Sequence, residues 1–297
     1  MILGAHAKIN LNLEVLGLRP DGYHELKTVF QSLALHDTLR FELADETFAI
    51  VCASPGVPLD ERNLVWQAAR LVWCAAGRSG EPAGRVRITK RIPAQGGLGG
   101  GSADGAAALV GWDRLWGTSL LESQLRELAV RLGADVPFFL CAGSALGLNR
   151  GDVVYPLVDR PASWVVLAFP PFGVSTPDAF RWWDEDAGRA GTTAGSGDRP
   201  SRDPFAVFND LEAPVSRRHP TLGEIRALLD QGGADAAAMT GSGSTVFGLF
   251  GAEEAALSAS RLLAARGWRT LVTRTATRRQ AGLGLRLRRP APAASAI

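Results

Sequence analysis

A run of glycines in the first half of the chain offers the main chain itself as a binding group. Five of the six residues from Gly96 to Gly101 are glycine, and Ser102 follows them. Glycine loses more backbone entropy on folding than any other residue, so such a run is expected where the chain needs unusual dihedral angles or approaches a ligand closely. The residue types therefore indicate a loop that binds a ligand.

The segments on either side of the glycine run predict a strand before it and a helix after it. Residues 86–89 alternate between apolar and polar, as a half-buried strand does. Ser102 is a good N-cap, and apolar residues from Leu109 to Trp116 recur at the spacing of one helix face. A helix that begins at the loop directs free N–H groups and the positive end of its dipole to one place. We therefore predict a bound phosphate there.

The glycine run matches none of three common nucleotide-binding motifs. A Walker loop requires Gly-Lys-Ser/Thr at its end, and no lysine follows these glycines. A dinucleotide fingerprint requires a third glycine where Ser102 stands. No His-Arg-Asp or Asp-Phe-Gly triplet marks a protein kinase. A flexible linker is the other interpretation, but linkers are polar and do not lie between a strand and an apolar helix.

An early strand carries polar side chains that are suited to chemistry. Residues 8–15 alternate strictly, which places Lys8, Asn10 and Asn12 on one face. A turn over 19–22 and a second strand through 28–35 follow, so we predict a hairpin. Asparagine is depleted in strands, yet it occurs twice here beside a lysine. Two interpretations stay open for this face, a solvated edge and the floor of an active site.

Asp135 is an acidic residue in an otherwise apolar run that ends at Leu140. A buried carboxylate is costly unless it is paired, so its position needs a reason. Aspartate is also favoured as the N-cap of a short helical turn, here one that contains Pro137. The residues alone support a functional carboxylate and a helix cap equally.

Composition narrows the class of protein. The chain has 297 residues, 46% of them hydrophobic, and a net charge of +2, which predicts a globular protein and gives no overall electrostatic case for nucleic acid or a membrane. Its three cysteines form no Cys-x-x-Cys pair, which suits a reducing compartment. There is no signal-peptide core or membrane-spanning run, so we expect a cytoplasmic protein. Only three of the 32 basic residues are lysine, at positions 8, 27 and 90.

The remaining segments predict two domains and a tail, divided as 1–150, 151–276 and 277–297. Asn63 is expected to cap a helix over 63–77, and Thr176 is expected to cap another. Residues 186–204 have no apolar period, which predicts a mobile loop. The tail is rich in arginine without period, which favours a solvated, disordered end over a nucleic-acid contact.

Taken together, these segments resemble the GHMP small-molecule kinases. The glycine run and a later Gly-Ser-Gly turn identify the superfamily. Two more specific stretches, Asp-Gly-Tyr-His at 21–24 and Phe-Asn-Asp-Leu-Glu at 208–212, point to one branch of it. The matching segments, in the family's order, are 7–11, 19–26, 92–102, 133–138, 208–212 and 239–243.

The resemblance implies an α+β protein with the two-domain GHMP kinase fold: an N-terminal nucleotide domain like ribosomal protein S5 and a C-terminal ferredoxin-like α/β sandwich that binds substrate. It implies ATP and Mg²⁺ as cofactors and phosphorylation of the 2-hydroxyl of a cytidine-diphosphate-linked methylerythritol, on the way to non-mevalonate isoprenoid precursors. Asp135 would be the general base, and Lys8 would lie beside it and stabilise the developing alkoxide.

The same resemblance assigns further residues to the two substrates. ATP would contact the glycine loop through Pro93, Gly96, Gly97, Leu98, Gly99, Gly100, Gly101, Ser102 and Ala103, with Asn63 near its adenine end. Ser102 is also a candidate Mg²⁺ ligand, although the resemblance does not settle the metal ligands. The acceptor would contact Asn10, Tyr23, His24, Thr176 and Phe180. Tyr23 and Phe180 would sandwich the cytosine, and His24 would read its hydrogen-bonding edge.

The chain departs from the family pattern at His6, Asp104 and Gly105, and the last two could weaken ATP binding by softening the helix start. A kinase for another acceptor, such as homoserine or mevalonate, is one alternative. A nucleotide-binding regulator without activity is another, although the presence of both Lys8 and Asp135 argues against it. The residues predict no oligomeric state.

Overall fold

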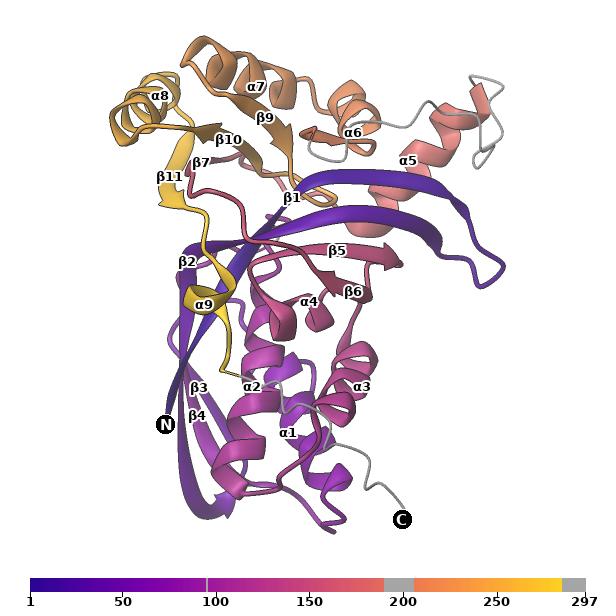
Figure 1. Cartoon of the computed structure of the whole chain (residues 1–297), viewed down its shortest axis with the longest axis vertical. Helices are drawn as coiled ribbons and strands as arrows, with labels where there is room; N and C mark the ends of the chain where they lie inside the picture. The colour runs from indigo at the N-terminus through magenta and orange to yellow at the C-terminus, as the bar shows by residue number, and fades with distance from the viewer. Residues whose placement is uncertain (95, 190–205, 285–297) are drawn as a thin grey trace, which may run out of the picture.

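The first sheet is organised around one long hairpin (Figure 1). The structure, a computed structural model, describes residues 1–94, 96–189 and 206–284. Strand β1 (Ile2–Leu18) pairs antiparallel with β2 (His24–Thr47) along its whole length. The predicted hairpin is therefore confirmed. However, β2 continues well past the predicted end at Leu35, because its second half pairs with another strand.

Within the described residues, five shorter strands complete this sheet, in the order β3-β4-β2-β1-β8, with β5 on β2 and β6 on β5. Strand β8 comes from the second half of the chain and pairs parallel with β1. The five strands are β3 (Ala49–Cys52), β4 (Ala83–Thr89), β5 (Ser144–Asn149), β6 (Val153–Pro156) and β8 (Phe208–Asn209).

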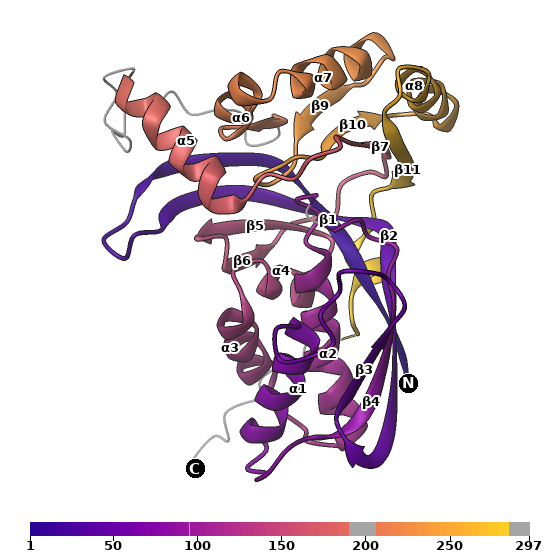
Figure 2. The same ribbon diagram turned by 180° about the vertical axis from the view of Figure 1, so that it is seen from behind.

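Four helices from the first half of the chain pack against this sheet (Figure 2). Helix α2 is central among them and buries Trp112 completely, with the ring of Phe41 edge-on at 5.1 Å. Asn63 caps α1 as predicted, because its side-chain oxygen accepts from the N–H of Val65. The helices are α1 (Leu64–Ala75), α2 (Gly100–Trp116), α3 (Glu122–Leu132) and α4 (Val136–Cys141).

The second sheet is fully antiparallel and has the order β11-β7-β10-β9. Helices α7 and α8 pack on this sheet, and α5 and α6 lie beside the tip of the β1–β2 hairpin (Figure 1). The strands are β7 (Trp164–Phe169), β9 (Ala236–Met239), β10 (Val246–Phe250) and β11 (Arg269–Arg274). The helices are α5 (Thr176–Arg189), α6 (Glu212–Arg218), α7 (Thr221–Gln231) and α8 (Glu253–Ala265).

A third apolar cluster joins the two sheets. Ile9 and Leu11 of β1 pack with Val165 and Phe247 of the second sheet, and Leu98 of the glycine loop belongs to the same cluster. The alternate, polar face of β1 is buried as well. The solvated-edge interpretation of this face is therefore wrong, because β1 has a paired strand on each side and Lys8 of the polar face packs over the Phe30 ring.

Two segments expected to be irregular are partly ordered. Helix α5 continues to Arg189, so the start of the predicted 186–204 loop is helical, and its remainder from residue 190 lies outside the described residues. The predicted tail begins with helix α9 (Arg278–Ala281), and the Arg278 guanidinium donates to the carbonyls of Cys141, Ser144 and Leu157. A solvated end is thus wrong for this helix; residues 285–297 are not described.

Candidate active site

The glycine loop leads directly into helix α2, which begins earlier than predicted. Gly99 occupies the N-cap position with a φ of 70°, and Ser102 lies inside the first turn. The predicted N-cap at Ser102 is therefore wrong. Gly99 adopts the left-handed region without steric cost, so the chain enters the helix without a capping side chain. The first N–H groups of a helix lack partners within it, which suits this end of α2 to an anion.

Two glycines of the loop lie where a larger residue does not fit. A Cβ atom on Gly97 would lie 2.3 Å from the carbonyl oxygen of Thr240, and one on Gly99 would lie 2.6 Å from the ring of Phe139. A Cβ atom on Gly101 would meet nothing within 4 Å. The described protein thus gives no steric reason for glycine at position 101, whereas a ligand close to the main chain would give one.

Two cavities meet at the glycine loop. The larger has a volume of about 820 Å³ and is lined by Lys8 and Asp135, and the smaller, of about 400 Å³, is lined by the loop from residue 96 to 102. Asn63 also lines the smaller cavity. Three residues of the loop, Gly97, Gly99 and Ser102, line both cavities. A phosphoryl donor in the smaller cavity and an acceptor in the larger one would meet at these residues.

A buried lysine and a partly exposed aspartate form an ion pair in the larger cavity. Lys8 Nζ lies 3.4 Å from Asp135 Oδ2, and the side chains are 4% and 37% exposed, respectively. Asn10 Oδ1 accepts from Lys8 Nζ at 2.7 Å. Asp135 stands at the N-cap position of α4, but its side chain makes no capping hydrogen bond. The carboxylate is therefore placed to accept a proton from a hydroxyl in the cavity.

Hydrogen bonds from two other segments hold Asn10. Its N–H donates to Thr240 Oγ1 at 3.1 Å, and its side-chain Nδ2 donates to Thr28 Oγ1 at 2.8 Å. The turn after Thr240 is held in turn by Asn209, which donates to the carbonyls of Met239 and Gly241 at 2.8 Å each. The Phe-Asn-Asp-Leu-Glu stretch and the Gly-Ser-Gly turn thus meet beside the ion pair.

Of the predicted acceptor residues, Asn10, Thr176 and Phe180 line the larger cavity, whereas Tyr23 and His24 contact residues that line it. The His24 ring stacks on Phe180, with centroids 4.6 Å apart and planes at 18°, and its Nε2 lies 2.9 Å from Asp184 Oδ1. Tyr23 is 57% exposed, and the Arg150 guanidinium lies over its ring at 4.8 Å. The structure thus pairs Phe180 with His24 and Tyr23 with Arg150, and shows no contact between Tyr23 and Phe180.

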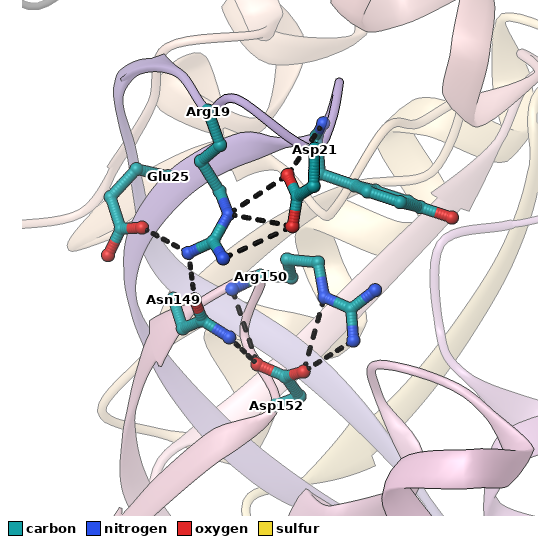
Figure 3. A network of polar contacts seen from close by, with 7 residues as sticks. Arg19, Asp21, Glu25, Asn149, Arg150 and Asp152 are labelled. Carbon is teal, nitrogen blue, oxygen red and sulfur yellow. Dashed lines mark hydrogen bonds and ion pairs between the residues drawn. The ribbon is translucent and has the colours of Figure 1, made fainter.

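A network of charged groups ties the hairpin turn to the β5–β6 turn (Figure 3). Arg19 contacts Asp21 and Glu25 of the hairpin and also donates to Asn149, which in turn donates to Asp152. Arg150 donates to the same Asp152 carboxylate at 2.9 Å. Burial alone would raise the pKa of Asp152, but the hydrogen bonds from Asn149 and Arg150 outweigh it and lower the pKa.

Helix α5 presents several of the acceptor residues. Ser175, not Thr176, caps this helix: its hydroxyl accepts from the N–H of Asp178 at 3.2 Å. The predicted cap at Thr176 is therefore wrong by one residue, which frees the Thr176 hydroxyl to contact Ser242 at 3.1 Å in the Gly-Ser-Gly turn. Thr176 and Phe180 line the larger cavity.

Asp184 and Arg150 contact the acceptor residues, although the sequence patterns did not lead us to expect a role for either. Asp184 follows Phe180 by four positions, so helical spacing places the two residues on the same face. This spacing could have identified Asp184 from the sequence. Arg150 offered none, because its position depends on the β5–β6 turn meeting the distant hairpin.

Comparisons with known proteins agree with this geometry. The chain matches the models of the GHMP kinases N terminal domain over residues 63–143 and of the GHMP kinases C terminal domain over residues 201–266. The protein is thus a GHMP kinase with the predicted two-domain fold, a class of ATP-dependent small-molecule kinases. It is 42% identical to the 4-diphosphocytidyl-2-C-methyl-D-erythritol kinase of Pelotomaculum thermopropionicum, over 91% of this chain and 96% of the relative. The chain belongs to this kinase family.

Solved structures give the same result. A crystal structure of 4-(cytidine 5'-diphospho)-2C-methyl-D-erythritol kinase is 34% identical, with a TM-score of 0.75 over 93% of this chain and 99% of that chain. A homoserine kinase from Cytophaga hutchinsonii is 19% identical, with a TM-score of 0.64 over 91% of this chain and 95% of that one. The second likeness shows the fold alone. Within the described ranges, no helix is both long and apolar enough to cross a membrane.

Proposed function

We propose that this protein transfers the γ-phosphoryl group of ATP to the 2-hydroxyl of 4-diphosphocytidyl-2-C-methyl-D-erythritol, a step toward isoprenoid precursors by the non-mevalonate pathway. The observation that carries the proposal is the Lys8–Asp135 pair in a cavity that shares Gly97, Gly99 and Ser102 with a second cavity. The identity to kinases named for this acceptor supports the choice of substrate.

On the donor side, Pro93 and residues 96–103 bind the triphosphate, and the main-chain N–H groups at the start of α2 donate to its phosphates. Asn63 lies near the adenine. Phosphoryl transfer requires alignment and neutralisation of charge more than covalent chemistry, and main-chain donors that do not reorganise supply both. No described protein atom lies within 4 Å of where a Cβ of residue 101 would be, so a bound ligand is the better explanation for glycine at this position.

On the acceptor side, Asp135 takes the proton of the 2-hydroxyl as this oxygen attacks the γ-phosphorus. Lys8 lies within 3.4 Å of the carboxylate and stabilises the negative charge that develops on the oxygen. Asn10, held from three sides, fixes the ammonium group and contacts the acceptor. The reaction therefore occurs where the two cavities meet.

Tyr23 and Phe180 hold the cytosine ring, His24 reads its edge, and Thr176 contacts the acceptor. Because His24 stacks on Phe180 and Arg150 on Tyr23, binding of the base includes replacement of one of these contacts. Asp184, bonded to His24 Nε2, leaves Nδ1 of this ring to face the base.

Mg²⁺ accompanies ATP in this proposal and neutralises charge on the phosphates. Across the parts of the chain that the structure describes, no group of three or more His, Cys, Asp or Glu side chains could hold a metal. This fits Mg²⁺ bound mainly by phosphates and water, with one or two protein ligands. Ser102, which lines both cavities, is the residue we assign to it.

An assay of ADP release tests the proposal. The purified protein is given ATP, Mg²⁺ and one of three alcohols: the cytidylyl methylerythritol, homoserine or mevalonate. We expect ADP release with the first alone, and a phosphorus spectrum of the product with a new monoester signal. Turnover of homoserine or mevalonate instead would assign another acceptor. ATP binding without turnover of any of them would indicate a regulator.

A further inference from the structure

Three charged residues meet beside the glycine loop, outside the catalytic ion pair. Lys90 follows strand β4, Asp37 lies on β2, and Asp104 lies in the second turn of α2. Lys90 Nζ lies 2.5 Å from Asp37 Oδ2 and 2.7 Å from Asp104 Oδ2. The three side chains are 13%, 0% and 6% exposed, so this charge cluster is almost dry. Lys90 and Asp104 also line the smaller cavity.

Asp37 holds the first residues of the glycine loop. Its Oδ1 accepts from the main-chain N–H groups of Arg91 and Ile92, at 2.5 and 2.9 Å. Its other oxygen accepts from Lys90. One carboxylate thus fixes the place where the chain leaves β4 and turns into the loop.

Asp104 holds the other end of the loop, where α2 begins. Its Oδ2 accepts from Lys90, and its Oδ1 is buried without a hydrogen-bond partner. A buried carboxylate oxygen without a partner is costly, and a neutral side chain of similar size would avoid the cost. A functional role for the Asp104 carboxylate would explain why a charged side chain is kept here in spite of this cost.

We propose that Lys90 is a positioning residue for the phosphate donor: by bridging Asp37 and Asp104, it holds the two ends of the glycine loop at a fixed separation and so preorganises the loop N–H groups for the phosphates of ATP. This inference rests on the proposed function, because it takes the glycine loop as the ATP site. The bridge connects residues 91 and 92 at the start of the loop to the first turns of α2 at its end.

The charge of Lys90 supports this role. Burial raises the pKa of Asp104 to about 7, with Lys90 lowering it and Asp37 raising it further. Burial would lower the pKa of Lys90, but the two carboxylates outweigh it and raise the pKa, so the bridge stays cationic. Arg62, which also lines the smaller cavity, is paired with Asp60.

The test compares Lys90→Met and Lys90→Arg with Arg85→Met, a control on the adjoining strand β4 that loses only an exposed ion pair with Glu46. ATP affinity is measured by calorimetry, and the KM for ATP, the KM for the acceptor and kcat are measured separately. We expect Lys90→Met to weaken ATP binding about tenfold or more, the size of a lost charged hydrogen bond. The KM for the acceptor should change little, Lys90→Arg should restore part of the affinity, and Arg85→Met should match the natural protein.

Asp104→Asn provides a second variant in case Lys90→Met does not fold. Because Asp104→Asn removes the charge that Lys90 bridges, it should raise the KM for ATP and leave the KM for the acceptor nearly unchanged. A purely structural cluster would change the melting temperature and leave the KM for ATP unchanged, and that result in either variant would overturn the inference. If the natural protein bound no ATP, the proposed function itself would fail instead.

Discussion

At the scale of single residues, the Lys8–Asp135 pair differs from an ordinary surface ion pair in its unequal burial. Lys8 is enclosed by Asn10 and the Phe30 ring, whereas Asp135 reaches the cavity. A lysine held in this way cannot swing to another partner, so its charge stays beside Asp135, where the proposed mechanism places the acceptor oxygen. The sequence alone left Asp135 undecided, because the neighbour that matters is far away in the chain.

Replacing Asp135 with Asn keeps the shape of the side chain and removes the base. We expect kcat to fall by about 10²- to 10⁴-fold, the range for loss of a general base, with little change in ATP affinity. Steady-state kinetics and calorimetric ATP binding measure the two quantities. An Asp135→Asn protein with nearly normal kcat would show that another group takes the proton.

Phe180→Ala tests the acceptor end of the larger cavity. Loss of one aromatic platform for the base should raise the KM for the cytidylyl substrate about tenfold, since base stacking contributes about 1–3 kcal/mol. The KM for ATP, measured in the same titrations, should remain within about twofold, because Phe180 lines the larger cavity and not the smaller one. Equal increases for both substrates would contradict the assignment.

At the scale of elements, the glycine loop contains glycines that are needed for two different reasons. Gly97 and Gly99 are required by their packing and positive φ, whereas Gly101 is open on the side where a Cβ would project. The run of glycines was visible in the sequence, but which positions serve packing depends on Thr240 and Phe139, which reach the loop only in the folded chain.

Gly97→Ala and Gly101→Ala separate these reasons. Gly97→Ala should lower the melting temperature, because the new methyl group would collide with the Thr240 carbonyl. Gly101→Ala should leave stability unchanged or raise it by about 0.5–1 kcal/mol, as Gly→Ala in a helix does, while weakening ATP binding. Thermal unfolding with and without ATP distinguishes the two. Unchanged ATP affinity in Gly101→Ala would show that the phosphates do not bind beside this residue.

The raised pKa of Asp104 also predicts how stability depends on pH. Between its ordinary value of 3.8 and about 7, the folded protein binds more protons at this site than the unfolded chain, so this site lowers the free energy of unfolding as the pH rises through that range. Asp104→Asn should therefore be more stable than the natural protein at pH 8 and nearly equal to it at pH 5. Urea unfolding at both pH values measures the difference.

At the scale of the whole molecule, the fold and its class could be predicted because local patterns and motif order agree. The hairpin, the Asn63 cap and the two-domain fold of a GHMP kinase are confirmed. Tertiary contacts explain two errors, the early end expected for β2 and the solvated-edge interpretation of β1. The two misplaced caps are local errors, because Gly99 and Ser175 take the positions expected for Ser102 and Thr176. The roles assigned to the site residues, and the domain limits at 150 and 276, remain predictions.

Helix α9 gives the clearest prediction at this scale. Arg278→Ala should lower the free energy of unfolding by about 1–3 kcal/mol, because three buried carbonyl contacts lose a charged donor. Exposed Arg279→Ala on the same short helix is the matched control and should change stability little. Chemical denaturation of both variants measures the change in the free energy of unfolding. Equal changes would show that the Arg278 contacts contribute nothing to stability.

The apolar cluster between the sheets has a consequence for how the chain unfolds. Residues 1–150 alone would expose Ile9, Leu11 and Leu98 and would lack strand β8. Neither half is then a self-sufficient folding unit, and calorimetry should record a single cooperative transition. Because Leu98 anchors the glycine loop in that cluster, the stabilisation that ATP confers on the loop should extend to the second sheet, as slower amide exchange in β7 and β10.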